Sequence, residues 1–239
     1  MNPTRRQFFG TTAALAGMAV APGLLLTEIR QANSETQASS KVRWGMLVDT
    51  TRCVQGCTAC VSACNTENGL SGRIGPDDSQ WIRKIELKEK TTGRALSLPV
   101  MCQHCAEPPC VDVCPTGASF KRADGIVLVD RHLCIGCRYC MMACPYKARS
   151  FVHEPLHDQK PDVPRGQGCV ESCTLCVQRV DRGEGPACVE ACKAEGREAL
   201  LFGDVNDPNS AISRRMREAG AKQIRADLQL DTGVRYQGI

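Results

Sequence analysis

The spacing of apolar positions along this chain predicts short strands joined by turns. Apolar and polar residues alternate between Trp81 and Met101, which is typical of two strands around a turn at Thr92-Gly93. A smaller hairpin is predicted with Phe120 and Lys121 on one arm, a turn at residues 123–125 and residues 126–129 on the other arm. A further short strand is expected at residues 199–203.

The segments between and after these strands carry turn and helix signals. Residues 153–168 are rich in proline and glycine, which predicts an ordered loop or a contact with a partner. Asp207 is expected to cap a helix with Pro208 in its first turn, and this helix would place Ile212, Met216 and Ala219 on one face. The polar tail that follows is expected to wrap the body.

The longest apolar run, from Phe8 to Leu26, follows Arg5 and Arg6 directly. This layout is typical of a twin-arginine export signal, and the glycines, threonines and proline in the run argue against the alternative of a membrane helix. We therefore predict a signal peptide over residues 1–38, a polar linker over 34–41 and a mature protein that starts near Val42. The twin-arginine translocase exports folded proteins, so the protein is expected in the periplasm, held at the inner membrane by partner subunits.

Composition limits the classes of protein that remain. Only 4% of the residues are aromatic, whereas 17 are cysteines, so we expect a group bound to sulfur to take the place of a large apolar core. The net charge of +4 is spread over both signs, which argues against a nucleic-acid-binding protein.

Sixteen cysteines fall into four groups, and Cys169 stands apart. The third group reads C-x2-C-x2-C-x3-C-P, the run by which bacterial ferredoxins bind 4Fe-4S clusters. Structural zinc prefers two pairs with a longer spacer, and an odd number of cysteines argues against a complete disulfide framework. The groups are Cys53, Cys57, Cys60, Cys64; Cys102, Cys105, Cys110, Cys114; Cys134, Cys137, Cys140, Cys144; and Cys173, Cys176, Cys188, Cys192.

The cysteine groups indicate an internal repeat. Gly136 lets the backbone of the third group come close, and Pro145 fixes the backbone after its last cysteine, whose thiolate in such runs binds the other cluster of a pair. Residues 102–152 form one two-cluster unit, and the first and fourth groups form a second unit into which it is inserted. The predicted class is α+β, with tandem ferredoxin-like units. The outer unit comprises 42–101 and 153–203, and 204–239 form the helix and tail.

The motifs CQHCAEPPCVDVCPTGAS, CIGCRYCMMACPYKAR, CTLC, CVEAC and FGDVNDPNS, together with TRRQFF, resemble those of a known family. This is the family of periplasmic four-cluster ferredoxin subunits of membrane oxidoreductase complexes, which includes subunits of nitrite and polysulfide reductases. The likeness extends from residue 1 to about residue 213.

The resemblance implies a ligand set for each of four 4Fe-4S clusters. Two features depart from the family pattern: the first group opens as C-x3-C, and Lys193 follows Cys192 where proline is usual. Cys169 belongs to none of these groups, and three roles are open for it: a substitute ligand for Cys53, a reactive thiol or an inert buried residue. The implied sets are Cys114, Cys134, Cys137, Cys140; Cys102, Cys105, Cys110, Cys144; Cys53, Cys57, Cys60, Cys192; and Cys64, Cys173, Cys176, Cys188.

The remaining polar candidates have supporting roles. His104 is expected to make a hydrogen bond near the ligands, whereas His132, His153 and His157 are expected on the surface or in loops. Lys147 and Arg149 either raise the potential of a nearby cluster or belong to a solvated basic face.

The sequence has neither a nucleotide-binding glycine loop nor a nucleophile motif, and clusters with four cysteine ligands leave no iron open for catalysis. We therefore predict a non-catalytic subunit that relays single electrons between a membrane quinone-interacting subunit and another redox protein such as a multihaem c-type cytochrome. By the resemblance, the complex serves dissimilatory sulfur metabolism; the alternative is a nitrite, polysulfide or molybdopterin reductase complex. A zinc or disulfide module and a sulfur-transforming enzyme that uses Cys169 remain rival hypotheses.

Overall fold

The computed structural model describes residues 38–70, 75, 77–157 and 159–239. The predicted signal peptide and its apolar run therefore lie outside the described residues, apart from Ala38. Within the described residues, no helix has the length and apolar character needed to cross a membrane.

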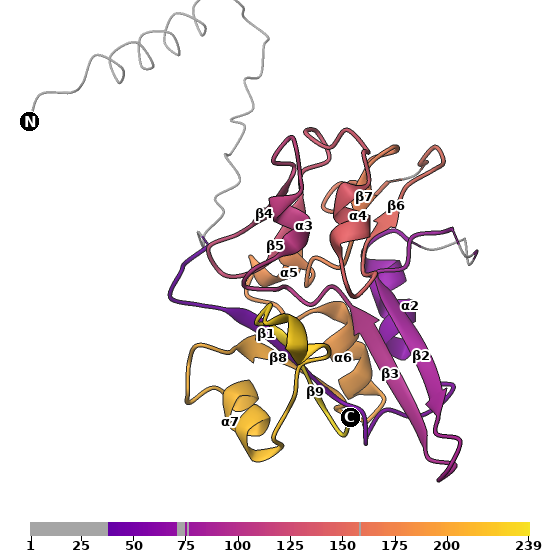
Figure 1. Ribbon diagram of the computed structural model, residues 1–239, viewed down its shortest axis with the longest axis vertical. Helices are drawn as coiled ribbons and strands as arrows, with labels where there is room; N and C mark the ends of the chain where they lie inside the picture. The colour runs from indigo at the N-terminus through magenta and orange to yellow at the C-terminus, as the bar shows by residue number, and fades with distance from the viewer. Residues whose placement is uncertain (1–37, 71–74, 76, 158) are drawn as a thin grey trace, which may run out of the picture. The chain divides into compact units, whose positions relative to one another are not determined.

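The described chain contains short helices and strands, as the sequence predicts, and belongs to the α+β class (Figure 1). The strands are β1 (Trp44–Asp49), β2 (Ile82–Lys88), β3 (Ala95–Met101), β4 (Ser119–Lys121), β5 (Val127–Val129), β6 (Ser150–Phe151), β7 (Val170–Glu171), β8 (Leu200–Asp204) and β9 (Val234–Gln237). The helices are α2 (Ala59–Glu67), α3 (Pro109–Asp112), α4 (Tyr139–Ala143), α5 (Val177–Val180), α6 (Ala187–Ala194) and α7 (Ala211–Glu218), with a 3-10 turn η1 (Ala226–Leu228).

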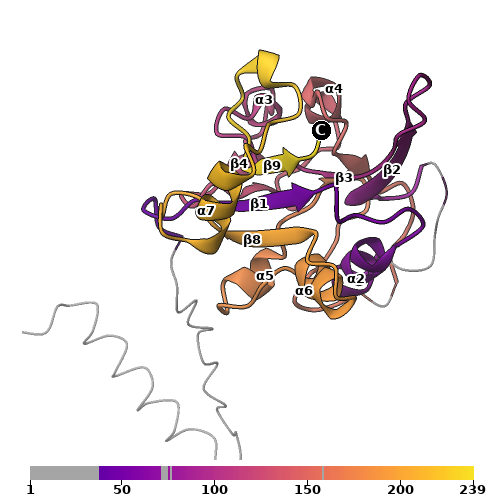
Figure 2. The same cartoon turned by 90° about the horizontal axis from the view of Figure 1, so that it is seen from below.

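A three-stranded sheet in the order β8-β1-β9 joins segments that are far apart in the sequence. β1 pairs antiparallel with β8 and parallel with β9, so the first strand lies between two C-terminal ones. Met46, Leu47 and Val48 are almost fully buried, because both faces and both edges of β1 are covered. Figure 2 shows this sheet with α3 and α4 on one side and α2, α5 and α6 on the other.

Both predicted hairpins are present. β2 and β3 pair from Ile82↔Met101 to Lys88↔Ala95, and Gly93 in the turn has a φ of +71°, which favours glycine. The buried end of β3 runs directly into the second cysteine group. β4 and β5 form the smaller hairpin, in which Phe120 faces Leu128 and Gly125 adopts a φ of +86° in the turn. The predicted strand after residue 198 is β8, and residues 153–168 form the predicted loop wherever they are described.

The predicted start of the C-terminal helix is wrong. α7 begins at Ala211, and Ser210 is its cap, because the Ser210 hydroxyl accepts a hydrogen bond from the backbone N–H of Ser213 at 3.1 Å. Asp207 instead accepts a hydrogen bond from the backbone N–H of Asn209 in a turn ahead of the helix. The predicted apolar face is correct, since Ile212 is buried and Met216 is half-buried.

The C-terminal segment after α7, predicted to wrap around the rest of the protein, also adds a buried strand to the sheet. It ends in β9, where Val234 is fully buried and Tyr236 is 1% exposed. The Tyr236 hydroxyl donates to the carbonyl of Pro99 at 3.2 Å and accepts from the side-chain amide of Gln103 at 3.0 Å. The backbone N–H of Gly233 donates to the carbonyl of Gln103 at 2.9 Å. The end of the chain is therefore fixed to the segment that contains Cys102 and Cys105.

Replacing Tyr236 with alanine tests this attachment. We expect Tyr236→Ala to lower the free energy of unfolding by about 3–5 kcal/mol, because it removes a large buried side chain and two hydrogen bonds. Chemical denaturation of anaerobically prepared protein measures the change. The matched control is Tyr139→Ala, since Tyr139 is 54% exposed and its loss should cost no more than about 0.5 kcal/mol. An equal effect of the two substitutions would contradict this role of the tail.

Candidate iron–sulfur cluster sites

All 17 cysteines lie among the described residues, and every one has a free thiol. The disulfide alternative is therefore wrong for this structure. Twelve of the thiols are buried, four are half-buried and only Cys137 is exposed, so sulfur occupies much of the core that aromatic residues fill in other proteins. No group of three or more His, Cys, Asp or Glu side chains among the described residues could hold a single metal ion, which gives the zinc alternative no site there.

Two small cavities are each lined by four cysteines. The first is lined by Cys114 from the second group and by Cys134, Cys137 and Cys140 from the third. The second is lined by Cys53, Cys57, Cys60 and Cys192, so the wider C-x3-C spacing of the first group still brings Cys53 to its neighbours. Gly56, in that wider loop, adopts a φ of +74°, which favours glycine and lets the additional residue turn outward.

The other eight thiols form two further sets. Burial and repulsion by the thiolates of Cys102, Cys110 and Cys144 together raise the pKa of Cys105 to about 12. Burial also raises the pKa of Cys173 well above its usual value, and Cys64, Cys188 and Cys176 add to that increase. The structure thus brings the sixteen thiols together in four sets of four.

Packed helix pairs account for this interleaving. Helix α2 packs on α6, and α3 packs on α4. In each pair, every helix supplies one thiol near its start to one set, and the thiol four residues later joins the neighbouring set. The second thiol lies within α2 and α6 but just after the end of α3 and α4. Cys60 and Cys64 do this from α2, and Cys188 and Cys192 do it from α6. The four-residue step keeps two sets close to each other across each helix pair.

Proline after the last cysteine decides the length of these helices. Pro145 follows Cys144, whose extended backbone (φ −73°, ψ 111°) ends α4 at Ala143. Lys193 follows Cys192, and α6 continues through it to Ala194. The departure from the family pattern at Lys193 therefore lengthens a helix and leaves Cys192 within its set.

Gly136 is needed for a close contact with another part of the chain. Its φ is +69°, and an added Cβ would lie 2.3 Å from the carbonyl oxygen of Gly168 and 3.2 Å from the ring of Phe151. The expected close approach therefore involves the loop before β7, which packs on the third cysteine group.

Backbone N–H groups donate to several of the thiols. Ser119 N–H lies 3.3 Å from Cys114 Sγ, and Ala199 N–H lies 3.3 Å from Cys192 Sγ. Burial would raise the pKa of Cys114, but these contacts with Ser119 and the nearby Thr116 lower it below its usual value. Such hydrogen bonds stabilise the thiolate form that binds iron.

Buried donors without a protein partner test whether a cluster fits beside the second group. His104 is 1% exposed, and its Nδ1 accepts from the N–H of Val127 at 3.0 Å, so its proton lies on Nε2, which has no hydrogen-bond partner in the protein. Nε and Nη1 of Arg149 and the hydroxyl of Tyr146 are also buried without partners. An anionic cluster provides sulfur acceptors for such donors. These residues therefore fit a 4Fe-4S cluster.

The structure separates the two basic residues behind the third group. Lys147 is exposed, whereas Arg149 is 5% exposed and its Nη2 lies 3.1 Å from Cys110 Sγ. Burial and the charge of Arg149 together lower the pKa of His104 to about 3, so this imidazole is neutral. His132, His153 and His157 are exposed.

Cys169 lies away from the cavity that contains Cys53. Its thiol donates to the carbonyl of Arg131 at 3.2 Å and lies beside Cys134, so it is not placed to substitute for Cys53. Burial raises the pKa of Cys169, which disfavours a reactive thiolate. These observations favour an inert buried residue.

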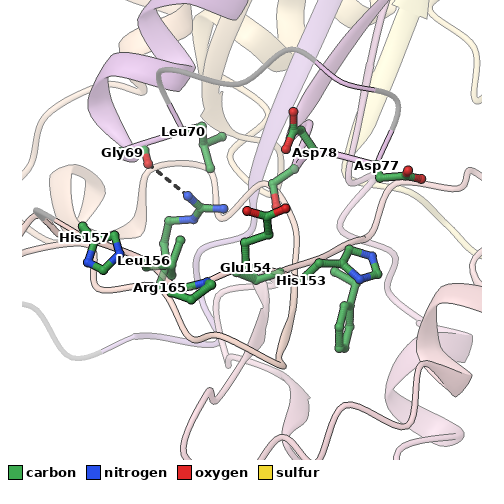
Figure 3. A pocket seen from close by; sticks show the side chains of 13 residues that line it. Gly69, Leu70, Asp77, Asp78, His153, Glu154, Leu156, His157 and Arg165 are labelled. Atoms are coloured by element: carbon green, nitrogen blue, oxygen red, sulfur yellow. Dashed lines mark hydrogen bonds between the residues drawn. The ribbon is translucent and has the colours of Figure 1, made fainter.

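A polar cavity of about 270 Å³ lies beside the loop after β6 (Figure 3). His153, Glu154 and His157 line it, and none of its described lining residues is a cysteine. Arg165 donates to the carbonyl of Gly69 at 3.0 Å and to both carboxylate oxygens of Glu171. Arg165 therefore ties the loop to the end of α2.

Tyr146 and Asn68 are also neighbours of the thiols, and the sequence did not predict either of them. Burial raises the pKa of Tyr146 to about 12, and the thiolates of Cys105 and Cys144 contribute to the increase. The side-chain amide of Asn68 lies 3.6 Å from Cys64 Sγ. Tyr146 carried a signal, since it lies two residues after Cys144, whereas Asn68 is one of many polar residues at the end of a helix.

Comparisons with known proteins agree with this chemistry. Family models described as 4Fe-4S dicluster domains match residues 52–118 and 94–204. The chain is 42% identical to the Hdr-like menaquinol oxidoreductase iron-sulfur subunit 1 of Archaeoglobus fulgidus, over 98% of this chain and 97% of the relative. It is 40% identical to a sulfite dehydrogenase subunit of Allochromatium vinosum, over 75% and 76% of the two chains. It is 37% identical to the protein NrfC of Escherichia coli, over 91% and 87%.

Dicluster domains, free thiols in sets of four and full-length relatives lead to one conclusion. The chain belongs to the family of 4Fe-4S iron–sulfur subunits of membrane oxidoreductase complexes.

Proposed function

We propose that this chain relays single electrons through four 4Fe-4S clusters, one held by each set of four cysteines. The observation that carries the proposal is the assembly of sixteen thiols into four sets, each built from two distant segments. A 4Fe-4S cluster with four thiolate ligands supplies one-electron exchange. The chain supplies the ligands, buries most of them and directs hydrogen bonds at their sulfur atoms.

The helix pairs support an inner unit inserted into an outer unit. α3 and α4 contribute to the two inner sets, whereas α2 and α6 contribute to the two outer sets. Because neighbouring sets share a helix pair, each unit holds its two clusters near each other. We propose domain boundaries at residues 42–101, 102–152, 153–203 and 204–239, with the outer unit split between the first and third segments.

The exposed thiol of Cys137 favours its set as a point of contact with a redox partner. Four large apolar side chains around this cysteine are exposed by 52–67%, which is unusual for residues of this type. They are Leu133, Ile135, Tyr139 and Met142. We propose that this surface contacts a membrane quinone-interacting subunit, and that a multihaem c-type cytochrome or another redox protein exchanges electrons elsewhere.

The proposed complex is one of dissimilatory sulfur metabolism, in which this chain has a role like that of DsrO in the DsrMKJOP complex. In support, two relatives are named as subunits of a sulfite dehydrogenase and of a tetrathionate reductase, and a third is named as part of a menaquinol oxidoreductase. The alternative is a nitrite, polysulfide or other molybdopterin reductase complex.

Metal analysis tests the number of clusters. We expect about sixteen iron atoms per chain in anaerobically purified protein, since four cubanes contain four iron atoms each. The protein should be brown, and reductant should bleach its absorbance and produce low-temperature EPR signals. About twelve iron atoms would contradict the count and point to the outer pair, and a colourless protein that contains zinc would overturn the proposal.

Two alanine variants test the ligand sets. Cys192→Ala should lower the iron content by up to about four atoms per chain, because Cys192 completes a proposed set. Cys169→Ala should leave iron content and absorbance unchanged, because Cys169 lies outside the four sets. Loss of iron from the Cys169 variant would instead make this thiol a ligand.

Cell fractionation tests the export signal. Replacing Arg5 and Arg6 with lysine should keep the protein in the cytoplasm, since the twin-arginine pair is what the translocase recognises. The unchanged chain should appear in the periplasm with its clusters bound. The same replacement at Arg83, which lies in β2 well beyond the signal, is the control and should not change export.

A further inference from the structure

Arg149 is a buried arginine between the two inner sets of thiols. Its Nη2 donates to Cys110 Sγ at 3.1 Å and to the Ser119 hydroxyl at 2.8 Å. Cys140 lies close enough for the charge of Arg149 to act on its thiol. Cys110 belongs to the set with Cys144, whereas Cys140 belongs to the set with Cys114. One guanidinium therefore hydrogen-bonds to a thiol of one inner set, and its charge acts on a thiol of the other.

No carboxylate among the described residues forms an ion pair with Arg149. Its Nε and Nη1 are buried and have no hydrogen-bond partner in the protein. A buried cation without an anion is strongly unfavourable, and arginine stays protonated in proteins. The anionic groups near Arg149 are the cysteines, so the charge that balances this residue has to come from thiolates and what they bind.

The outer sets have cations of a different kind. Lys84 lies near Cys53 and Cys60, but it pairs with Glu86 at 3.3 Å. Arg179 lies near Cys176, but it pairs with Glu67 at 3.4 Å. The charge of Glu67 also acts unfavourably on the thiolates of Cys64 and Cys176. Carboxylates therefore neutralise the cations beside the outer sets. Within the described part of the chain, the charge of Arg149, beside the inner sets, is balanced only by the thiolates and the clusters that they bind.

We propose that Arg149 is a counter-cation shared by the two inner clusters and that it gives them higher reduction potentials than the two outer clusters. The inference rests on the proposed four clusters. Reduction adds one negative charge to a cluster, and a positive charge in a buried site of low dielectric favours the reduced form. Because Arg149 hydrogen-bonds to Cys110 and its charge also acts on Cys140, it favours reduction of both inner clusters.

The position of Arg149 therefore gives the relay two pairs of clusters with different reduction potentials. Electrons that enter the chain come to rest on the inner pair, next to the exposed Cys137 and its apolar surroundings. The outer pair is then the section that electrons cross at higher energy. The inner clusters should have the higher reduction potentials in the isolated chain, without any partner bound.

Redox titrations followed by EPR on the anaerobically purified full chain test the proposal. Arg149→Gln should shift the reduction equilibrium of both inner clusters toward the oxidised form by tenfold or more, which is about 59 mV for a one-electron couple. Arg149→Lys keeps the charge and should restore much of the shift. Lys147→Gln is the matched control: it removes a positive charge two residues away, but from an exposed position, and it should change the potentials little.

Iron content separates failure of this inference from failure of the proposed function. Full iron content with unchanged inner potentials in Arg149→Gln, or an equal shift in Lys147→Gln, would overturn the inference and leave the relay intact. Iron content far below about sixteen atoms in the unchanged chain would overturn the relay itself.

A second measurement decides the matter if Arg149→Gln does not bind its clusters. Cys137→Ser alters one ligand of an inner cluster and so marks its EPR signal. Comparing the EPR spectra of Cys137→Ser and the unchanged chain identifies the signal of this inner cluster. During stepwise reduction of the unchanged chain, that signal should be among the first two to appear. Its appearance after both outer signals would overturn the proposal.

Discussion

The fold depends on the burial of sulfur in groups of four. Twelve buried thiols crowd into a core that contains few aromatic residues, and neighbouring thiolates help to raise the pKa values of Cys105 and Cys173. As bare thiolates they would repel one another, and as neutral thiols they would leave hydrogen-bond donors such as His104 Nε2 and two nitrogens of Arg149 without acceptors. A bound iron–sulfur cluster relieves both problems, because it shares the thiolate charge and supplies acceptors. Stability and electron transfer thus depend on the same contacts.

The chain brings its thiols into sets of four by using the same arrangement of loop and helix in two helix pairs. In each cysteine group a loop presents the first two thiols, the start of a packed helix presents the third, and the fourth, four residues later, reaches the neighbouring set. Helices α3 and α4 are short, with four and five residues, whereas α2 and α6 have nine and eight. Proline after Cys114 and Cys144, and its absence after Cys64 and Cys192, accounts for much of this difference.

The sequence predicted local features and sulfur chemistry well. Alternation and turn glycines located the β2-β3 and β4-β5 hairpins, because pairing within a hairpin depends on nearby residues. It did not predict β1 or β9, which pair across almost the whole chain, and Met46-Leu47-Val48 is too short an apolar run to identify as a strand by its period. The cap of α7 was placed three residues early, since Asp207 and Ser210 are both good caps and only the contacts of Ser210 decide between them. The burial of Arg149 beside an exposed Lys147 likewise follows from tertiary packing.

The position of β9 has a consequence for the timing of folding. The most C-terminal strand of the described fold, β9, lies beside its first strand, β1, and Gly233, just before β9, hydrogen-bonds to the segment of Cys102 and Cys105. Because synthesis runs from the N-terminus to the C-terminus, this sheet stays incomplete until β9 has been made. Assembly of the sheet therefore waits for its most C-terminal strand, and a chain that stops before β9 lacks the strand that completes it.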